Sequence, residues 1–300
     1  MTTYRIEHST TYTYDAGVTG SYGTFHLRPR DEEWQSCLSH DVVITPTPAD
    51  LFRHRDLYGN TKTYFHVTEP HTELKVTAIN TVEVRGRDYD PELLSQPWEQ
   101  ARPAVRPDQP DAWLATDFTF ASPMVDVPPE ARAYALESFQ PGRGIAEAAT
   151  DLMHRVFRDF TYKAGSTTVS TRVGELLERR TGVCQDFTHV MVSSLRSLGL
   201  AGRYVSGYLA TRPPPGKARV FGADASHAWV GCWMPGAGWL YLDPTNDRLA
   251  DESHATVAWG RDYADVTPVK GVIFTESKSS TMKVSVDMAP AALLPLGSAS

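Results

Sequence analysis

The sequence has few cysteines and no long apolar run. Its three cysteines, Cys37, Cys184 and Cys232, are odd in number and do not form the disulfide framework of a small secreted protein. No stretch of about 18 consecutive apolar residues occurs, which predicts that no segment spans a membrane. No apolar run follows Met1, so we expect no signal peptide. Free thiols suit a reducing compartment, and the expected location is therefore the cytoplasm.

Positive charge is also scarce. The chain carries 29 Lys and Arg against 36 Asp and Glu, a net charge of −7, and its isoelectric point is about 5.8. This balance argues against nucleic acid and anionic membrane surfaces as partners. With 41% hydrophobic and 22% charged residues over 300 positions, the composition is typical of a soluble globular protein with one large or two ordinary domains. Nothing in the sequence indicates the oligomeric state.

Residues 1–90 are predicted to form an N-terminal β domain. Apolar and polar side chains alternate over residues 4–14, and further short apolar runs are separated by turn residues. Residues 58–60 predict a turn between two strands, and the glycine-rich residues 17–20 predict a hairpin. Residues 74–84 predict two strands or one long bulged strand. Short strands at this spacing are typical of a sandwich or a curled sheet.

Residues 91–128 have a different composition. Frequent prolines exclude any long helix or strand there. The segment is nevertheless too rich in aromatic residues for a loose linker, namely Trp98, Trp113, Phe118 and Phe120. We therefore expect an extended connection that packs against the domains on both sides.

Residues 129–289 are predicted to contain a core of helices and strands and the segment that follows it. The apolar spacing predicts an amphipathic helix over residues 145–160. Antiparallel strands are predicted over residues 203–210, 228–234 and 239–243.

Two stretches near or after these strands have no regular pattern. Residues 213–216 are three prolines and a glycine, which predict a loop near the expected substrate groove. Residues 290–300 are expected to form a disordered tail.

Cys184 lies where a predicted loop becomes a helix. Gly182 comes just before it, and the apolar residues after it recur at intervals of three and four until Gly199. Cys184 is therefore predicted to lie in the first turn of a buried helix, where unpaired N–H groups and the helix dipole favour the nucleophilic thiolate. A free cysteine alone is more often a core residue, so this interpretation depends on its partners.

His227 and Asp243 can act as those partners. His227 begins one predicted strand, and Asp243 ends another. A cysteine, a histidine and an aspartate can act as nucleophile, general base and orienting carboxylate. We expect His227 to take the thiol proton and later to protonate the leaving amine, while Asp243 holds the imidazole tautomer. His189 should point along the helix, which makes it a poorer candidate for the base.

Three motifs in this order resemble the core of the transglutaminase-like superfamily. They are Gly-Val-Cys-Gln-Asp-Phe at 182–187, Ser-His-Ala-Trp-Val at 226–230 and Leu-Asp-Pro-Thr-Asn at 242–246. The bacterial branch, often described as proposed cysteine proteases, is the most similar, and the resemblance extends over most of the chain. It implies an α+β fold, in which an N-terminal β-sandwich-like domain precedes a papain-like, transglutaminase-type core of helices packed on an antiparallel sheet.

The resemblance also implies a reaction, which is acyl transfer through a thioester on Cys184. The substrate would be a protein or peptide with a peptide-bond or glutamine-type amide. If water resolves the thioester, the protein is an amidase or protease, and if a lysine amine does so, it is a transglutaminase; the motifs leave both open. Animal transglutaminases require calcium, but the sequence has no EF-hand type loop, and we expect no metal and no cofactor. The candidate zinc ligands lack the usual paired spacing, namely Cys184, His189, Cys232 and His254.

Four further residues are candidates for substrate binding or for the oxyanion site. The backbone N–H of Cys184 should supply one oxyanion donor. Tyr162 is the candidate for a second, because the superfamily often uses an aromatic region upstream of the cysteine. Gln185 and Asp186 would shape the entrance or support the site. Trp229 adjoins the site, although a packing role is the simpler interpretation.

Two alternatives to this function remain open. In the first, the core is catalytically silent and serves as a peptide-binding or scaffolding module. In the second, the enzyme acts on a non-peptide amide, as in the related peptide N-glycanase and arylamine acetyltransferase types. A narrow, closed pocket would favour the second alternative, and an open groove would favour a peptide substrate.

Overall fold

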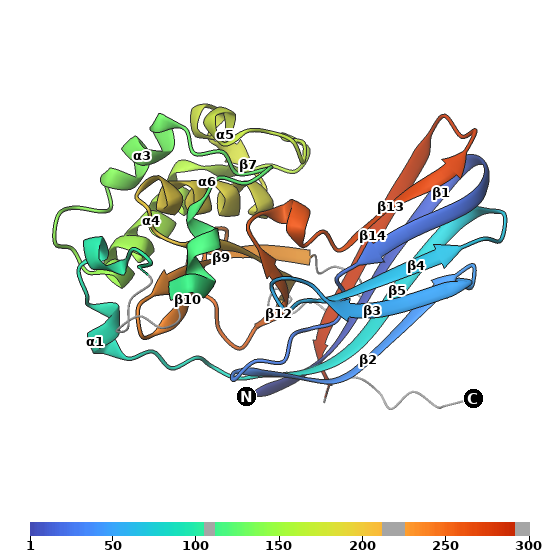
Figure 1. Ribbon diagram of the computed structural model, residues 1–300, viewed down its shortest axis with the longest axis horizontal. Coiled ribbons are helices and arrows are strands. Elements are labelled where there is room, and N and C mark those ends of the chain that lie inside the picture. The colour runs from blue at the N-terminus through green and yellow to red at the C-terminus, as the bar shows by residue number, and fades with distance from the viewer. Residues whose placement is uncertain (105–111, 212–225, 292–300) are drawn as a thin grey trace, which may run out of the picture.

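The computed structural model describes residues 1–104, 112–211 and 226–291. A sheet of long strands lies on one side of the molecule, and a mixture of helices and shorter strands lies on the other (Figure 1). The α+β class predicted from the sequence is therefore confirmed. Within the described ranges, none of the helices has the length and apolar character needed to cross a membrane.

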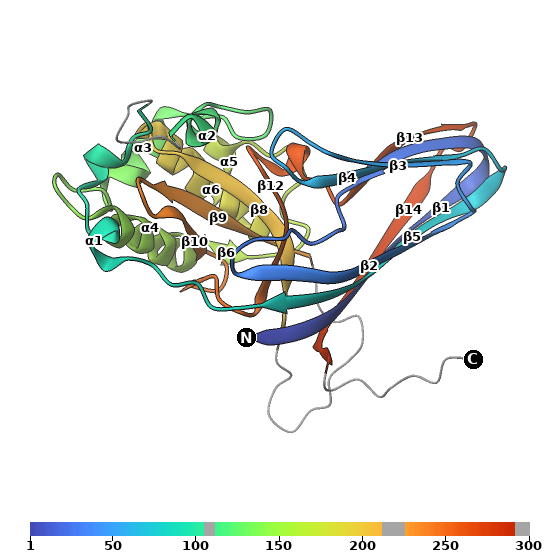
Figure 2. The same ribbon diagram turned by 60° about the horizontal axis from the view of Figure 1, so that its bottom comes forward.

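The first sheet is organised around β1 (Thr2–Phe25), a strand of 24 residues. The strand order is β2-β5-β1-β4-β3, and β13 and β14 also pair with β1. The bounds of the other strands are β2 (Gln35–Thr45), β3 (Asp50–Arg55), β4 (Thr61–Val67), β5 (His71–Val84), β13 (Val269–Thr275) and β14 (Ser280–Pro290). Buried and exposed residues alternate along β5, as expected where one face of a sheet covers a core. The sheet is curled rather than flat (Figure 2).

The structure corrects the hairpin predicted at residues 17–20. The pairing of β1 only shifts register there, and the strand continues to Phe25. The predicted turn at residues 58–60 is confirmed, because it joins β3 to β4 and Gly59 adopts a φ of 74°. Residues 74–84 belong to one long strand, β5.

Strands β13 and β14 lie in the first sheet, although the sequence analysis grouped residues 129–289 with the core. The first half of β1 pairs with β5 and β14, and its second half pairs with β4 and β13. A strand as long as β1 would otherwise leave a row of unpaired backbone groups along one edge. Pro290 ends β14, whereas residues 292–300 of the predicted tail and the loop predicted at residues 213–216 lie outside the described residues.

The second sheet and its helices form the core of the other half of the molecule. The strand order is β11-β10-β9-β8-β12. The strands are β8 (Gly202–Leu209), β9 (Ser226–Met234), β10 (Gly238–Asp243), β11 (Arg248–Leu249) and β12 (His254–Gly260). The helices are α3 (Pro129–Leu136), α4 (Ile145–Asp159), α5 (Val173–Arg179) and α6 (Cys184–Ser197). Helix α6 packs against β8 and β9, and Gly199, with a φ of 75°, follows its last turn as predicted.

The connection over residues 91–128 contains only short helical segments. They are α1 (Pro91–Leu94), η1 (Trp98–Ala101), α2 (Ala112–Thr116) and η2 (Asp117–Thr119). Trp98 is buried in the helical core, and Phe118 packs against Tyr58 of the N-terminal half. The connection therefore contacts both halves of the molecule.

Buried amide side chains join the two halves. The Gln35 side chain donates to the carbonyl oxygen of Thr256 at 2.8 Å and accepts from the Thr256 N–H at 2.7 Å. Asn60 pairs with the backbone of Trp259 in the same way, at 2.8 and 3.0 Å. Both amides are almost fully buried, so these backbone-like pairs fix the first sheet against β12.

Replacing Gln35 with alanine should destabilise the protein. The Thr256 N–H would lose its buried acceptor, while the Thr256 C=O would keep the Arg30 N–H as a donor, and the free energy of unfolding should fall by about 1–3 kcal/mol. Urea denaturation followed by tryptophan fluorescence measures the change. Gln140→Ala is the control, because Gln140 is exposed and its side chain bonds only to the nearby carbonyls of Leu136 and Glu137. An equal loss in both variants would contradict the role given to Gln35.

Candidate active site

Cys184 is the first residue of α6, and a short parallel ladder holds the loop before it. Strand β6 (Thr161–Tyr162) pairs with β7 (Thr181–Gly182), which sets Tyr162 beside Gly182. Val183 is extended, and the helix then begins at Cys184. The thiol is half-buried, at the positive end of a 14-residue helix. This is the position that the sequence predicts.

Asp186 supports the turn that carries Cys184. Its carboxylate accepts hydrogen bonds from the Val183 N–H at 2.8 Å and the Thr167 hydroxyl at 2.6 Å. A Cβ atom on Gly182 would come within 2.7 Å of this side chain, so position 182 needs a glycine. Burial raises the pKa of Asp186, and the two hydrogen bonds oppose that rise. Because only 2% of Asp186 is exposed, the residue serves as a support behind Cys184.

His227 and Asp243 lie together where neighbouring strands end. His227 is the second residue of β9, and Asp243 is the last residue of the adjacent strand β10. The His227 Nε2 atom lies 2.8 Å from Asp243 Oδ2. The imidazole also interacts with the side chain of Cys184. The tertiary structure thus brings together all three residues that the sequence analysis selected.

Burial is the largest single influence on the pKa of each member of this pair, but hydrogen bonds and charges together outweigh it. Burial alone would lower the pKa of His227, but the hydrogen bond and charge of Asp243 and the interaction with Cys184 raise it to about 10. Burial would raise the pKa of Asp243, yet hydrogen bonds from His227 and His254 hold that pKa well below its usual range. His227 is therefore an imidazolium at neutral pH when both partners are charged.

The carboxylate of Asp243 has further donors that the sequence analysis did not identify. His254 Nε2 lies 3.1 Å from Oδ2, and the Asn246 side-chain amide donates to the same oxygen at 2.8 Å. The backbone N–H groups of Thr245 and Asn246 donate to Oδ1. The sequence analysis considered His254 only as a zinc ligand. Its pairing with Asp243 depends on the position of β12, for which no local sequence signal exists.

The same residues are close enough to raise the question of a metal ion. The ligand atoms of His227, Asp243 and His254 lie within 4.8 Å of one another. Each histidine is hydrogen-bonded to the one carboxylate, which accounts for this proximity without an ion. The cluster therefore carries no assignment of a metal.

Three tyrosines lie near Cys184. Tyr162 is 57% exposed, and Tyr204 and Tyr263 are buried or half-buried. Burial raises the pKa of each, and the charge of Cys184 raises it further. Tyr162, the candidate oxyanion residue, is therefore close to the thiol and accessible to a ligand.

The other selected residues have different surroundings. Gln185 is half-buried in the first turn of α6. Trp229 is fully buried, and its ring meets His254 edge-on at 5.2 Å between centroids, so it supports the histidines and has no surface for a ligand. His189 is buried and accepts from the Tyr263 N–H at 3.3 Å. Burial lowers the pKa of His189 to about 4.

A cavity of about 290 Å³ adjoins the site. Ser226 and Tyr263 line it from the core, and Tyr12, Met282 and Val284 line it from β1 and β14. Ser226 is the residue before His227, and Tyr263 lies close to Cys184. The first sheet thus forms one wall of this cavity, which sequence patterns did not indicate.

Replacing Asp243 with asparagine should lower the pKa of His227. In the wild type the imidazolium should persist to about pH 10, and its contribution to stability should be complete below about pH 6.5 and be lost as the pH rises through 10. In Asp243→Asn, burial remains while the carboxylate charge is gone, so His227 should titrate below pH 7. NMR of the ring protons measures both values. A wild-type His227 that titrates near 6.5 would contradict the assignment.

Comparisons with known proteins identify the family of the chain. A family described as the bacterial transglutaminase-like N-terminal region matches residues 4–83, and the transglutaminase-like superfamily matches residues 132–244. An uncharacterized protein of Mycobacterium tuberculosis is 48% identical over 294 residues, which cover 96% of this chain and 92% of that protein. A protein-glutamine gamma-glutamyltransferase of Pseudomonas aeruginosa is 33% identical over 122 residues, which cover 39% of this chain and 18% of that protein.

A solved structure agrees in fold over nearly the whole chain. A proposed cysteine protease from Cytophaga hutchinsonii has a TM-score of 0.68 at 19% identity, covering 96% of this chain and 93% of that chain. The two matched regions cover strands β1 to β5 of the first sheet and the part of the core that carries Cys184, His227 and Asp243. On this combination of sequence and fold, the chain belongs to the bacterial transglutaminase-like proteins of the transglutaminase-like superfamily.

Proposed function

We propose that the protein is a thiol enzyme that transfers or hydrolyses the acyl group of a peptide or glutamine-type amide through a thioester on Cys184. One observation carries the proposal: the His227 imidazole lies 2.8 Å from the buried Asp243 carboxylate and interacts with the side chain of Cys184. A charged imidazole between a carboxylate and a helix N-terminal cysteine favours the thiolate. Such an arrangement has a clear chemical use and is costly to maintain in a passive core.

The first half of the reaction forms the thioester. The Cys184 thiolate attacks the amide carbonyl carbon, and a C–S bond forms while the carbonyl oxygen becomes an oxyanion. When the tetrahedral intermediate collapses, the C–N bond breaks. The imidazolium of His227 gives its proton to the departing nitrogen, which leaves as ammonia or an amine.

The second half returns the enzyme to its starting state. Water or a primary amine attacks the thioester carbonyl, and neutral His227 accepts the proton of that nucleophile. The C–S bond breaks, which releases the acid or the new amide and restores the thiolate. Asp243 stays ionised throughout and stabilises the imidazolium each time it forms.

The donors that stabilise the oxyanion come from the first turn of α6 and from the loop before it. The backbone N–H groups in the first turn of α6 have no partners within the helix, and that of Cys184 is the first donor. The exposed hydroxyl-bearing ring of Tyr162, beside Gly182, is the second donor that we propose. The cavity of about 290 Å³ between Tyr263 and β14 would bind the acyl part of the substrate. We infer that the substrate is a protein or peptide and that the enzyme works in the cytoplasm, where its free thiols stay reduced.

Iodoacetamide at about pH 6 should modify Cys184 selectively. An ordinary thiol is less than about 1% ionised at this pH. Burial raises the pKa of Cys37, and it raises that of Cys232 to about 12, so the chain contains its own slow-reacting controls. His227→Ala should slow alkylation of Cys184 at least about tenfold, because the imidazolium that favours the thiolate is gone. Intact-mass and peptide mass spectrometry measure the rates; equal rates in wild type and variant would contradict the proposal.

Glutamine-containing peptides should then separate hydrolysis from transfer. The wild type should release ammonia from such a peptide, and addition of a primary amine should give either an amine-linked product or no new product. The first result identifies a transglutaminase, and the second identifies an amidase. Cys184→Ala should abolish both reactions. No reaction of any peptide by a wild type whose Cys184 is readily alkylated would instead favour the non-peptide amide.

A further inference from the structure

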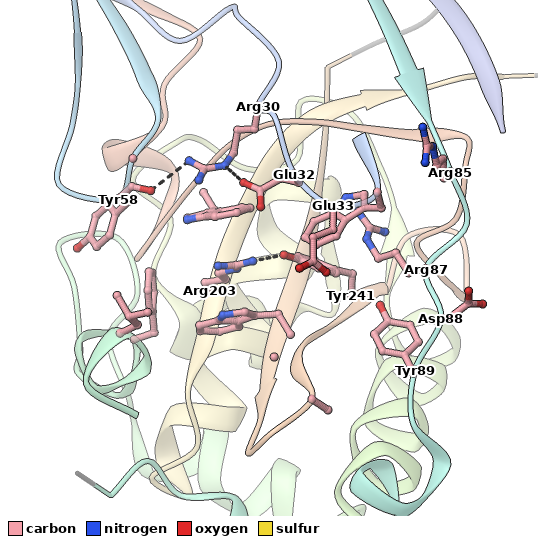
Figure 3. Close-up of a pocket in the computed structure, with 18 of the residues that line it drawn as sticks. Arg30, Glu32, Glu33, Tyr58, Arg85, Arg87, Asp88, Tyr89, Arg203 and Tyr241 are labelled. Carbon is pink, nitrogen blue, oxygen red and sulfur yellow. Dashed lines mark hydrogen bonds and ion pairs between the residues drawn. The ribbon is translucent and has the colours of Figure 1, made fainter. Parts of the chain in front are cut away.

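A second and larger cavity lies between the first sheet and the core. Its volume is about 830 Å³, within the range of small-molecule sites. Four arginines line it, namely Arg30 after β1, Arg85 and Arg87 after β5, and Arg203 on β8 (Figure 3). Arg85 is exposed and pairs with Glu83, whereas the other three are buried or half-buried. Aromatic side chains form much of the remaining wall, namely Trp34, Tyr58, Phe118, Trp239, Tyr241 and Trp259. None of these residues belongs to the Cys184 site.

The arginine side chains are stacked on aromatic faces. The Arg203 Cζ atom lies 3.6 Å from the ring centroid of Trp259 and 4.1 Å from that of Trp239. The Arg87 Cζ atom lies 4.5 Å from the ring centroid of Trp34 and 4.3 Å from that of Tyr241, two rings that also pack on each other. Stacking covers the faces of a guanidinium group, but its N–H bonds lie in the plane and still need acceptors.

Several of those donors have no acceptor. Within the described part of the chain, Arg203 Nε and both Nε and Nη2 of Arg87 are buried without a hydrogen-bond partner. Arg203 as a residue is only 4% exposed, and its Nη2 donates to the Tyr241 hydroxyl. Arg87 Nη1 donates a hydrogen bond to the Ala250 carbonyl oxygen at 3.1 Å. A buried guanidinium donor that remains unpaired carries a substantial desolvation cost.

Among the residues that the structure describes, the carboxylates at this cavity do not pair with the free donors of Arg87 and Arg203, so the desolvation cost remains. Glu32 lies 2.7 Å from Arg30 Nε and is committed to that arginine. Glu33 and Asp88 also line the cavity, but both residues are exposed to solvent. Arg30 and Arg203 share the ring of Trp259 and repel each other. Burial lowers the pKa of the guanidinium groups of Arg30, Arg87 and Arg203, to about 10 for Arg203.

The neighbouring strand leaves space for the Arg203 side chain. Arg203 lies opposite Gly231 in the β8–β9 pair. A Cβ atom on Gly231 would come within 2.9 Å of the Arg203 side chain, so the glycine makes room for the arginine to lie across the sheet. A merely exposed cation would need no such accommodation.

We propose that this cavity binds a small organic anion through a carboxylate or phosphate group, held by the in-plane donors of Arg87 and Arg203 between aromatic walls. Charge-assisted bonds from two guanidinium groups suit an oxyanion with two or more acceptor oxygens. The aromatic surfaces of Trp34 and Trp239 would cover the apolar part of the ligand. Because the ligand would contact both halves of the molecule, it would also stabilise their association.

Isothermal titration calorimetry of the full chain at constant ionic strength tests the proposal. Citrate and inorganic phosphate are the probes, which distinguish carboxylate from phosphate recognition. We expect saturable binding of at least one, together with a rise in the thermal unfolding midpoint. Arg87→Gln and Arg203→Lys should each weaken binding at least about tenfold, the loss of one charge-assisted contact. Arg158→Gln, on an exposed arginine of α4, is the matched control and should leave binding unchanged.

Three results would overturn the proposal. They are the absence of saturable binding of either probe at millimolar concentration, binding that survives in both cavity variants, and binding that falls equally in Arg158→Gln. Arg87 lies outside the strands and helices, so Arg87→Gln decides the matter if Arg203→Lys does not fold. Cys184→Ala should bind the anion like the wild type, which separates this site from the thiol chemistry.

Discussion

The buried carboxylate of Asp243 is the interaction on which the candidate active site depends. It is fully buried, and an isolated carboxylate there would be strongly unfavourable. Donors from β9, β12 and the turn after β10 surround it, and they include two histidines, an asparagine side chain and two backbone N–H groups. Its hydrogen bond and charge raise the pKa of His227, and the side chain of His227 also interacts with that of Cys184 at the start of α6. Removing the carboxylate would leave two histidines without their common acceptor.

The second constraint is the length of β1. A strand of 24 residues needs partners along both edges, and the chain supplies them from its early part and from its last described strand. This return of β14 to the first sheet forms a wall of the small cavity beside Cys184. The first sheet thus lines a cavity that also contains Ser226, the residue before His227.

Strand β10 connects the large cavity with the candidate active site. Trp239 and Tyr241 line the large cavity with the arginines, and Asp243 follows two residues later on the same strand. Alternate residues of a strand point to one face, so these three side chains share a face of the sheet. The buried Trp229 fills the space between the histidines and this aromatic cluster. One sheet face therefore carries both the orienting carboxylate and the cationic cavity.

The sequence by itself determined the local features of this protein. Gly182 before Cys184, the apolar spacing of α6, Gly199 after it, and the strand-end positions of His227 and Asp243 are all short-range patterns, and each was found where it was predicted. His254 beside Asp243, β13 and β14 beside β1, and the meeting of Arg30, Arg87 and Arg203 were decided only by the tertiary structure. Periodicity and capping act over a few residues, whereas these pairings join segments far apart in the chain. They depend on which strand edges and which buried charges need partners once the fold has closed.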